Sequence, residues 1–216
     1  MRDLKSIIWF CLIACCLFSC LSSKQSLSDG WVSLFDGKSL KDWKVGENSG
    51  TFLVENGMIV VHGKTAHLFY EGEVENHDFR NFEFKADVMT HPGANSGIYI
   101  HTTYQERGWP SKGYEVQVNN SHSDWRRTGS LYGIDDVKEV FVKDNEWFTE
   151  DILVQGKKVI IKLNEKVVVD YTEPENVKRS PDDSLRVLSS GTFALQGHDP
   201  NSLVYFKNLM VKPLPK

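Results

Sequence analysis

Cysteine is missing from most of this sequence, and its absence excludes several kinds of site. All four cysteines (Cys11, Cys15, Cys16 and Cys20) lie within residues 1–20. The rest of the chain can therefore contain no disulfide, no thiolate nucleophile and no cysteine-based zinc site. Without disulfides, the remaining roughly 190 residues must be held together by a hydrophobic core, and that length suffices for one domain.

Clustered charge of one sign is also missing. The formal net charge at pH 7 is −4, and the basic residues are interspersed with the acidic ones along the chain. A nucleic-acid-binding protein typically shows a basic patch or an arginine-rich stripe, and this sequence has neither. We therefore expect no nucleic acid among its partners.

An apolar run covers residues 6–18, after a short basic start. Its length is typical of a signal peptide and too short for a comfortable membrane-spanning helix. The run ends in Leu-Phe-Ser-Cys, which is similar to the processing box of bacterial lipoproteins. We therefore expect residues 1–20 to be a lipoprotein-type signal peptide and Cys20 to carry a lipid anchor in the cell envelope. The alternative is an ordinary secretory signal peptide that is cleaved close to this site.

Two further segments follow from composition. Residues 21–29 are polar and rich in serine, which predicts a short tether. Residues 30–216 contain no internal repeat and no linker, so we expect them to form a single domain. Within it, residues 178–184 carry Pro181 and two aspartates, which predicts an exposed loop.

Short strand-like runs dominate the domain, and helical periodicity is nearly absent. Asn56-Gly57 separates two such runs, which is a strong signal for a two-residue hairpin. The best helical candidates are a turn or two at residues 39–43 or 135–140. Many short antiparallel strands without crossover helices predict an all-β antiparallel sandwich or jelly roll. Strands are expected at residues 31–35, 52–55, 58–62, 79–89, 95–101, 113–120, 152–154, 157–163, 167–171, 192–196 and 203–211.

Two of these runs alternate strictly and line one face with hydrogen-bonding groups. In the run 113–120, Glu115, Gln117 and Asn119 share a face, because alternate side chains of a strand point the same way. In the run 95–101, Tyr99 and His101 share a face. We expect residues 99, 101, 115 and 117 to point into a common hollow that suits a polyhydroxylated ligand. A face that simply contacts water is the alternative.

Seven segments together resemble one known family. They are L-F-D-G-K-S-L-K-D-W (34–43), E-N-G-M-I (55–59), N-S-G-I-Y-I-H (95–101), G-Y-E-V-Q-V (113–118), T-G-S-L-Y (128–132), G-T-F-A-L-Q-G-H-D-P (191–200) and V-Y-F-K-N-L-M-V-K-P-L (204–214). The resemblance covers residues 30–214 and is to the 3-keto-disaccharide hydrolases. It implies a concanavalin A-like jelly roll and cleavage of sugars oxidised to a ketone at C3. Members of that family often carry Arg where this chain has His101.

The spacing of acidic residues argues against ordinary glycoside hydrolysis, which needs two carboxylates flanking the scissile bond. Sandwich-fold glucanases commonly present them as E-x-D-x-E on one strand. The matching strand here presents Glu115, Gln117 and Asn119, so one carboxylate and two amides. A 3-keto sugar needs less, because its ketone acidifies the C2 proton and lets the glycosidic oxygen leave by elimination. The enzyme then supplies a base, an acid and a donor for the enolate oxygen.

These roles predict specific site residues. Glu115 or His101 is the expected base, and a divalent ion held by His101, Glu115 and His198 is an open possibility. Water addition after elimination would complete net hydrolysis of a 3-keto-glycoside made by a separate sugar oxidoreductase. Groups expected to bind the oxidised sugar are Asn95, Tyr99, Gln117, Tyr132 and Gln196, with Trp109 and Trp125 stacking on its ring.

Each assignment has a structural alternative. Glu115 can instead pair with Arg107, Arg126 or Arg127. The His198-Asp199-Pro200 segment can simply shape a loop. A lectin-like domain that binds carbohydrate without catalysis is the alternative for the whole protein, because the same sandwich hosts enzymes and lectins.

Overall fold

The structure is a computed structural model that describes residues 29–215. The expected signal peptide (residues 1–20), the Cys20 anchor and all of the 21–29 tether except Asp29 lie outside the described residues. Within residues 29–215, no helix has the length and apolar character needed to cross a membrane.

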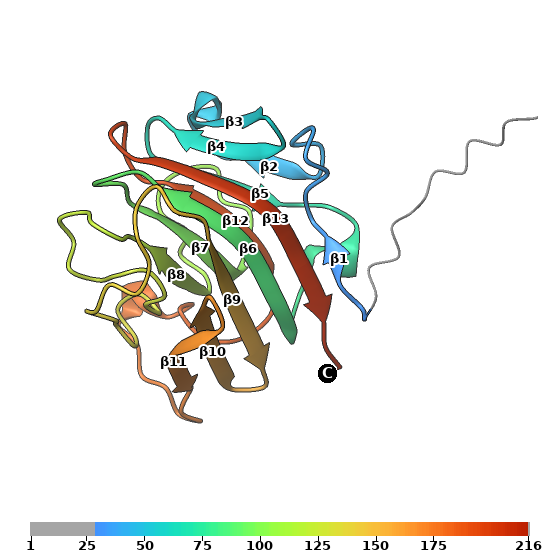
Figure 1. The fold of residues 1–216 in the computed structure, drawn as a ribbon. Helices are drawn as coiled ribbons and strands as arrows, with labels where there is room; N and C mark the ends of the chain where they lie inside the picture. The colour runs from blue at the N-terminus through green and yellow to red at the C-terminus, as the bar shows by residue number, and fades with distance from the viewer. Residues whose placement is uncertain (1–28, 216) are drawn as a thin grey trace, which may run out of the picture.

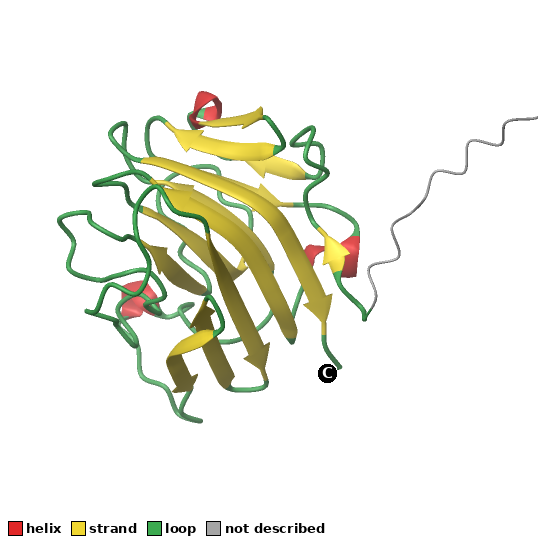
Figure 2. Cartoon of the chain, in the orientation of Figure 1, coloured by secondary structure: helices red, strands yellow, loops and turns green. Residues whose placement is uncertain are grey.

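Two antiparallel sheets pack face to face, as the sequence predicts (Figures 1 and 2). The strand order of the larger sheet is β11 (Lys166–Thr172), β10 (Lys158–Leu163), β9 (Phe148–Gln155), β6 (Phe82–Thr90), β13 (Leu203–Pro213), β4 (Met58–His62) and β3 (Phe52–Glu55), and β1 (Val32–Ser33) pairs with β13. The strand order of the smaller sheet is β2 (Trp43–Val45), β5 (Ala66–Tyr70), β12 (Thr192–Gly197), β7 (Ser96–Thr102) and β8 (Tyr114–Val118).

Turn chemistry explains several of the connections. Asn56 and Gly57 both have positive φ values, 51° and 80°, and they join β3 to β4 as the predicted hairpin. Residues 40–43 form one hydrogen-bonded turn, in which the N–H of Trp43 donates to the carbonyl oxygen of Leu40 at 2.9 Å, but no helix follows from it. Just before it, the carboxylate of Asp36 accepts hydrogen bonds from the N–H groups of Lys38 and Ser39, which stabilises a further turn.

Helix is confined, in the described part of the chain, to three short 3₁₀ turns (red in Figure 2). They are η1 (Ser49–Thr51), η2 (Val74–His77) and η3 (Pro181–Asp183). The second helical candidate, residues 135–140, is irregular loop rather than helix. The turn η3 falls inside the loop predicted at residues 178–184.

The core lies between the two sheets and follows from strand alternation. In β6, Phe82, Phe84, Ala86 and Val88 are fully buried, while the charged side chains between them are partly exposed. Phe193 of β12 packs across the core, with its ring centroid 4.8 Å from that of Phe82 and 4.7 Å from that of Phe84. Aromatic contacts of this kind tie the inner faces of the sheets together.

The smaller sheet is covered on its outer face as well. All five residues of β5 are buried, and so are all seven of β7 and all six of β12. The register places Ala194 of β12 between Phe69 of β5 and Tyr99 of β7, and Tyr99 beside Glu115 of β8. Side chains on this outer face therefore form a sheltered floor.

Candidate active site

A cavity of about 410 Å³ opens above this floor. Its size falls within the range of small-molecule sites, roughly 300–1,000 Å³. Strands β7, β8 and β12 supply the floor, and loops supply the walls. The lining residues are Asn95, Tyr99, Trp109, Pro110, Ser111, Gly113, Glu115, Gln117, Asp124, Tyr132, Asp182, Asp183, Arg186, Gln196 and His198.

Glu115 lies at the centre of the hydrogen bonding on the floor. Its Oε2 accepts a hydrogen bond from the hydroxyl of Tyr99 at 3.0 Å, and its Oε1 accepts one from Nε2 of Gln196 at 2.8 Å. Three adjacent strands thus converge on one carboxyl group. Because the strands are hydrogen-bonded neighbours, the positions of these side chains are set by the regular geometry of the sheet.

The environment of Glu115 brings its pKa close to neutrality. Burial raises the pKa to about 7, although the hydrogen bonds from Tyr99 and Gln196 and the charge of Arg186 oppose that rise. The pKa of Tyr99 is raised well above 10, chiefly by burial and also by the Glu115 charge, so Tyr99 stays protonated and keeps donating. A carboxyl group with a pKa near 7 can both give and take a proton at neutral pH.

A second polar network lies beside Glu115. Gln117 donates from Nε2 to Oδ1 of Asn95 at 3.2 Å, and Nδ2 of Asn95 lies 3.3 Å from Nδ1 of His122. The Oε1 atoms of Gln117 and Gln196 are buried without a hydrogen-bond partner in the described residues. Buried polar atoms normally have partners, so these two acceptors suit hydroxyl groups of a ligand.

The walls contribute charge and an aromatic surface. Arg186 donates to the backbone oxygen of Tyr132 and lies 3.5 Å from a carboxylate oxygen of Asp183. Trp109 is about half exposed, and its ring lies 5.4 Å from that of His67 and 5.5 Å from that of His198. The wall loops therefore place a cation and an indole face over the floor.

The loop that carries Arg186 is anchored by a buried carboxylate. Glu173 accepts hydrogen bonds from the hydroxyl of Tyr114 and, at 2.9 Å, from the N–H of Leu188, and its Oε1 lies 3.3 Å from Nζ of Lys157. Arg179 extends the network by donating to the Tyr114 hydroxyl at 2.7 Å. The start and end of the loop are thus tied to β8, the strand that bears Glu115.

His101 does not point into the cavity, so the prediction that it shares a face with Tyr99 is wrong. The register between β7 and β12 shifts at this point, and His101 has a φ of +54°, which marks a bulge. The bulge turns His101 into the core, where its ring meets that of Phe82 edge-on at 5.6 Å. A β-carbon on Gly113 would lie 2.0 Å from the backbone oxygen of Ile100, so the bulge also requires a glycine there.

Both ring nitrogens of His101 are occupied by the backbone. Nε2 lies 2.9 Å from the carbonyl oxygen of Arg80, and Nδ1 accepts a hydrogen bond from the N–H of Ser189 at 3.2 Å. Burial lowers the pKa of His101 to about 4. The residue is a neutral core histidine, and it is placed neither as a base nor as a metal ligand.

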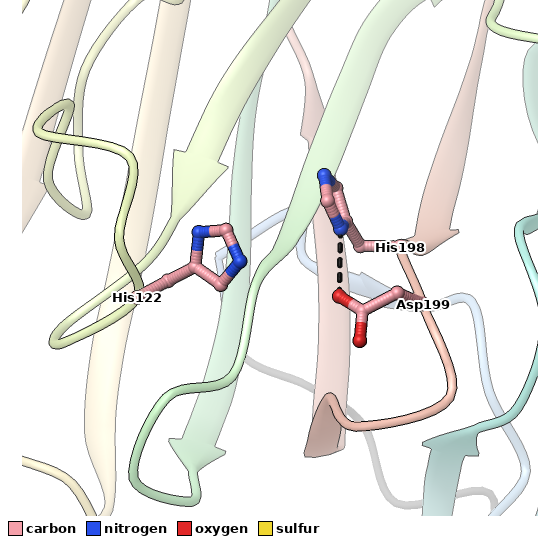
Figure 3. Close-up of side chains that lie close together, drawn as sticks. All are labelled: His122, His198 and Asp199. Atoms are coloured by element: carbon pink, nitrogen blue, oxygen red, sulfur yellow. Dashed lines mark hydrogen bonds and ion pairs between the residues drawn. The ribbon is translucent and has the colours of Figure 1, made fainter.

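The predicted metal set of His101, Glu115 and His198 is therefore not assembled. In the described residues a different trio, His122, His198 and Asp199, brings potential ligand atoms within 4.8 Å of one another (Figure 3). The trio fits a metal poorly, because Nδ1 of His122 accepts the backbone N–H of Asp124 at 3.1 Å. Its neutral ring then keeps a proton on Nε2 and has no free lone pair for an ion.

Trp125 lies outside the cavity. The guanidinium of Arg126 stacks between the rings of Trp125, at 4.8 Å, and Tyr132, at 4.6 Å. Tyr132 lines the cavity and donates to Asp124 at 3.3 Å. Trp125 is thus one layer removed from any ligand, whereas Trp109 borders the cavity directly.

The structure brings eight of the expected site residues to one cavity and adds several that sequence reasoning missed. The eight are Asn95, Tyr99, Trp109, Glu115, Gln117, Tyr132, Gln196 and His198. The missed residues are Asp124, Asp182, Asp183 and Arg186, which lie in loops without periodicity. The predicted exposed loop at 178–184 contained two of them, and that was the only signal.

Comparison with known proteins agrees with this architecture. Residues 30–212 match a family described as the 3-keto-alpha-glucoside-1,2-lyase-like domain. A search of curated proteins found no match. A "putative glycosyl hydrolase" from Parabacteroides distasonis ATCC 8503 is similar in structure, with a TM-score of 0.72 and 24% identity over 86% of this chain and 94% of that chain.

More distant structures share the fold alone. The non-specific endo-beta-1,3(4)-glucanase SCLam has a TM-score of 0.53 and 11% identity, covering 84% of this chain and 88% of its own. The carbohydrate-binding module CBM66 from Bacillus subtilis has a TM-score of 0.50 and 14% identity, covering 85% and 95%. Both an enzyme and a binding module thus adopt this sandwich. On the match across residues 30–212, the chain belongs to the 3-keto-α-glucoside-1,2-lyase-like family, whose neighbours are carbohydrate-active proteins with the concanavalin A-like jelly roll.

Proposed function

We propose that this protein cleaves glycosides whose sugar ring carries a ketone at C3. The glycosidic oxygen leaves by elimination, and water then adds to the product, which gives net hydrolysis. The observation that carries the proposal is Glu115, a carboxyl group with a pKa of about 7 at the floor of a cavity lined by amides and hydroxyls. Family membership supports the same chemistry.

The reaction requires three catalytic functions, and the cavity contains a group suited to each. A base removes the C2 proton, an acid protonates the departing oxygen, and a positive or donating group stabilises the enolate. Glu115 is suited to proton transfer. Arg186 carries the formal positive charge of the described lining, so it can stabilise the enolate oxygen, with Asn95 and Gln117 orienting the hydroxyls.

Ordinary glycoside hydrolysis is a second candidate, because Asp124 shares the cavity with Glu115. Two carboxylates in one site satisfy the basic requirement of that reaction. Both oxygens of Asp124 are engaged, however: Oδ1 lies 3.5 Å from Nη1 of Arg126 and Oδ2 accepts from Tyr132. These contacts favour a fixed anion over a nucleophile or acid. Binding without catalysis is the third candidate, since CBM66 shares the fold.

One experiment separates the three. The wild-type protein and Glu115→Gln are incubated with a 4-nitrophenyl glucoside and with its 3-keto counterpart, and release of nitrophenol is measured. Cleavage of the 3-keto compound alone, lost in Glu115→Gln, supports the proposal. Cleavage of the unoxidised glucoside supports two-carboxylate hydrolysis, and sugar binding without release supports a lectin. Tyr205→Phe, on β13 of the other sheet, is the control.

The substrate class implies a partner reaction. A 3-keto sugar arises when an oxidoreductase removes hydride from C3, so we propose that a separate sugar oxidoreductase supplies the substrate. We also propose export to the bacterial cell envelope, with Cys20 lipidated. Labelling with a radioactive fatty acid in wild type but not in Cys20→Ser would support the anchor, and equal labelling would exclude it.

A further inference from the structure

Elimination needs a second proton-transfer group, and we propose that His198, oriented by Asp199, is the base that removes the C2 proton while Glu115 is the acid. The inference rests on the proposed function and assigns the two directions of proton transfer within the same cavity. His198 becomes a catalytic residue and Asp199 a positioning residue.

The contact between His198 and Asp199 sets the tautomer. Nδ1 of His198 lies 2.8 Å from Oδ2 of Asp199, the interaction drawn in Figure 3. A carboxylate only accepts, so Nδ1 carries the proton and the lone pair of the neutral ring is on Nε2. No hydrogen bond occupies Nε2 in the described residues. This histidine can therefore accept a proton at a free atom, in the manner of a base oriented by a carboxylate.

Asp199 is itself held as an anion. Although burial acts to raise the pKa of Asp199, hydrogen bonds from His198 and from Ser202, together with the N–H of Asn201, lower it overall. Ser202 donates to the same Oδ2 at 2.8 Å, and Asn201 donates to Oδ1 at 2.8 Å. The His198-Asp199-Pro200 segment therefore does shape a loop, which was the alternative to a role in the site. The same hydrogen bonds also fix the orientation of the His198 imidazole.

Strand β12 brings His198 to the cavity that holds Glu115 of β8. Gln196 is in β12, and its side chain donates to Glu115. His198 follows two residues later and also lines the cavity, with its ring against Trp109. Because alternate residues of an extended segment face the same side, Gln196 and His198 are presented together.

The environments of the two groups set opposite directions for the proton. Burial favours the protonated form of Glu115, which can give a proton, whereas the dyad leaves a lone pair on His198, which can take one. The charged and titratable groups around Glu115 are Tyr99, Arg186, Asp124 and Tyr132. Those around His198 are Asp199, His122 and His67. Among the carboxylates that line the cavity with them, Asp124 is held by Arg126 and Tyr132, Asp183 is held by Arg186 and Ser180, and Asp182 is exposed.

Atoms and electrons balance in both the elimination step and the hydration step. Nε2 takes the C2 proton, and the C–H electrons form the enolate. The enolate oxygen regenerates the C3 ketone, a C1–C2 double bond forms, and the C1–O bond breaks as Glu115 protonates the departing oxygen. In hydration, the Glu115 carboxylate takes a proton from water, the water oxygen bonds to C1, and protonated His198 returns a proton to C2.

The test measures removal of the C2 proton separately from cleavage. A 3-keto-1,5-anhydroglucitol has no aglycone, so in D₂O it reports exchange at C2 without cleavage. Exchange is followed by NMR for wild type, His198→Gln, Asp199→Asn and Glu115→Gln. His91→Gln, whose ring contacts Tyr205 on the other sheet, is the matched control. Cleavage of the nitrophenyl 3-keto-glucoside is measured in parallel across pH.

We expect His198→Gln to lose exchange by about 100-fold or more, and Asp199→Asn to lose it by about 10-fold or more through the wrong tautomer. Glu115→Gln retains exchange but cleaves about 100-fold more slowly, and its residual cleavage rate no longer falls above pH 7. Exchange at the wild-type rate in His198→Gln overturns the assignment while leaving the proposed function intact. So does activity abolished by a chelator and restored by Zn²⁺ or Mn²⁺, which would make His198 a ligand. If the wild-type protein neither exchanges the C2 proton nor cleaves the 3-keto-glucoside, both the His198 assignment and the proposed function are wrong.

Discussion

Gly97 and Glu115 are diagonal neighbours on adjacent strands, and the missing side chain of Gly97 makes room for the carboxyl group of Glu115. A β-carbon built on Gly97 would lie 2.5 Å from Oε1 of Glu115 and 2.9 Å from its Cγ. Real contacts are never that short, so any other residue at 97 must displace Glu115. The glycine of the N-S-G motif, Gly97, is therefore needed so that the carboxyl group of Glu115 can occupy its position on the floor of the cavity.

Replacing Gly97 by Ala tests this relationship. We expect Gly97→Ala to fold but to lose activity by about 100-fold or more, since Glu115 moves away from Tyr99 and Gln196. Gly50→Ala is the matched control, because nothing lies within 4 Å of a β-carbon there. Circular dichroism and turnover of the 3-keto substrate are the measurements. An active Gly97→Ala protein would show that the position of Glu115 is unimportant.

The pH dependence of cleavage follows from the hydrogen bond between Tyr99 and Glu115. The Tyr99 hydroxyl stabilises the charged carboxylate, so Tyr99→Phe raises the pKa of Glu115 above its value of about 7. With Glu115 as acid, the fall in kcat/KM at high pH moves upward. A profile that moves downward, or does not move, would contradict the assignment. Tyr205→Phe controls for loss of a hydroxyl in the other sheet.

Two of the exposed tryptophans, Trp109 and Trp125, give different expectations. Trp109 borders the cavity, whereas Trp125 contacts it through Arg126. Stacking of a ring on an aromatic face contributes about 0.5–1.5 kcal/mol, so Trp109→Ala should raise KM by about 2- to 12-fold. Trp125→Ala should leave KM nearly unchanged. Steady-state kinetics on the same substrate decide between them, and the reverse order of effects would place the sugar on the other side of Tyr132.

Glu150 predicts a pH dependence of stability that is unrelated to catalysis. It lies in β9 with its side chain in the core, and neither carboxyl oxygen has a hydrogen-bond partner in the described residues. Burial raises its pKa well above 4.5. The unfolded chain therefore releases this proton at lower pH than the folded protein, and the free energy of unfolding falls as pH rises above about 4.5.

Two substitutions test that reading. Glu150→Gln removes the titration, and Glu150→Leu also removes the unpaired polar group. Both should flatten the decline in unfolding free energy between pH 5 and 8. At pH 8, Glu150→Leu should be more stable than wild type by about 1–3 kcal/mol. Urea denaturation at both pH values is the measurement, and a decline that persists in both variants would assign it to other groups.

Sequence reasoning reached the fold because alternation and turn chemistry agree along most of the chain. It missed β5, whose residues are buried on both faces, because a strand covered on both sides shows no alternation. It placed Glu115 and Gln117 correctly on one face because β8 is regular. It misplaced His101 because a bulge breaks the alternation, and nothing in the letters of that run marks the bulge. Arg186 was beyond reach, since its position depends on contacts of a loop with distant residues.

The division between a floor made of strands and walls made of loops has an evolutionary consequence. Substitutions or insertions in the segments that carry Trp109, Asp124 and Arg186 can reshape what the cavity admits without disturbing the register that holds Glu115. On the proposed function, duplicated copies of this domain with different wall loops would accept different aglycones while each keeps the same proton-transfer groups on the floor.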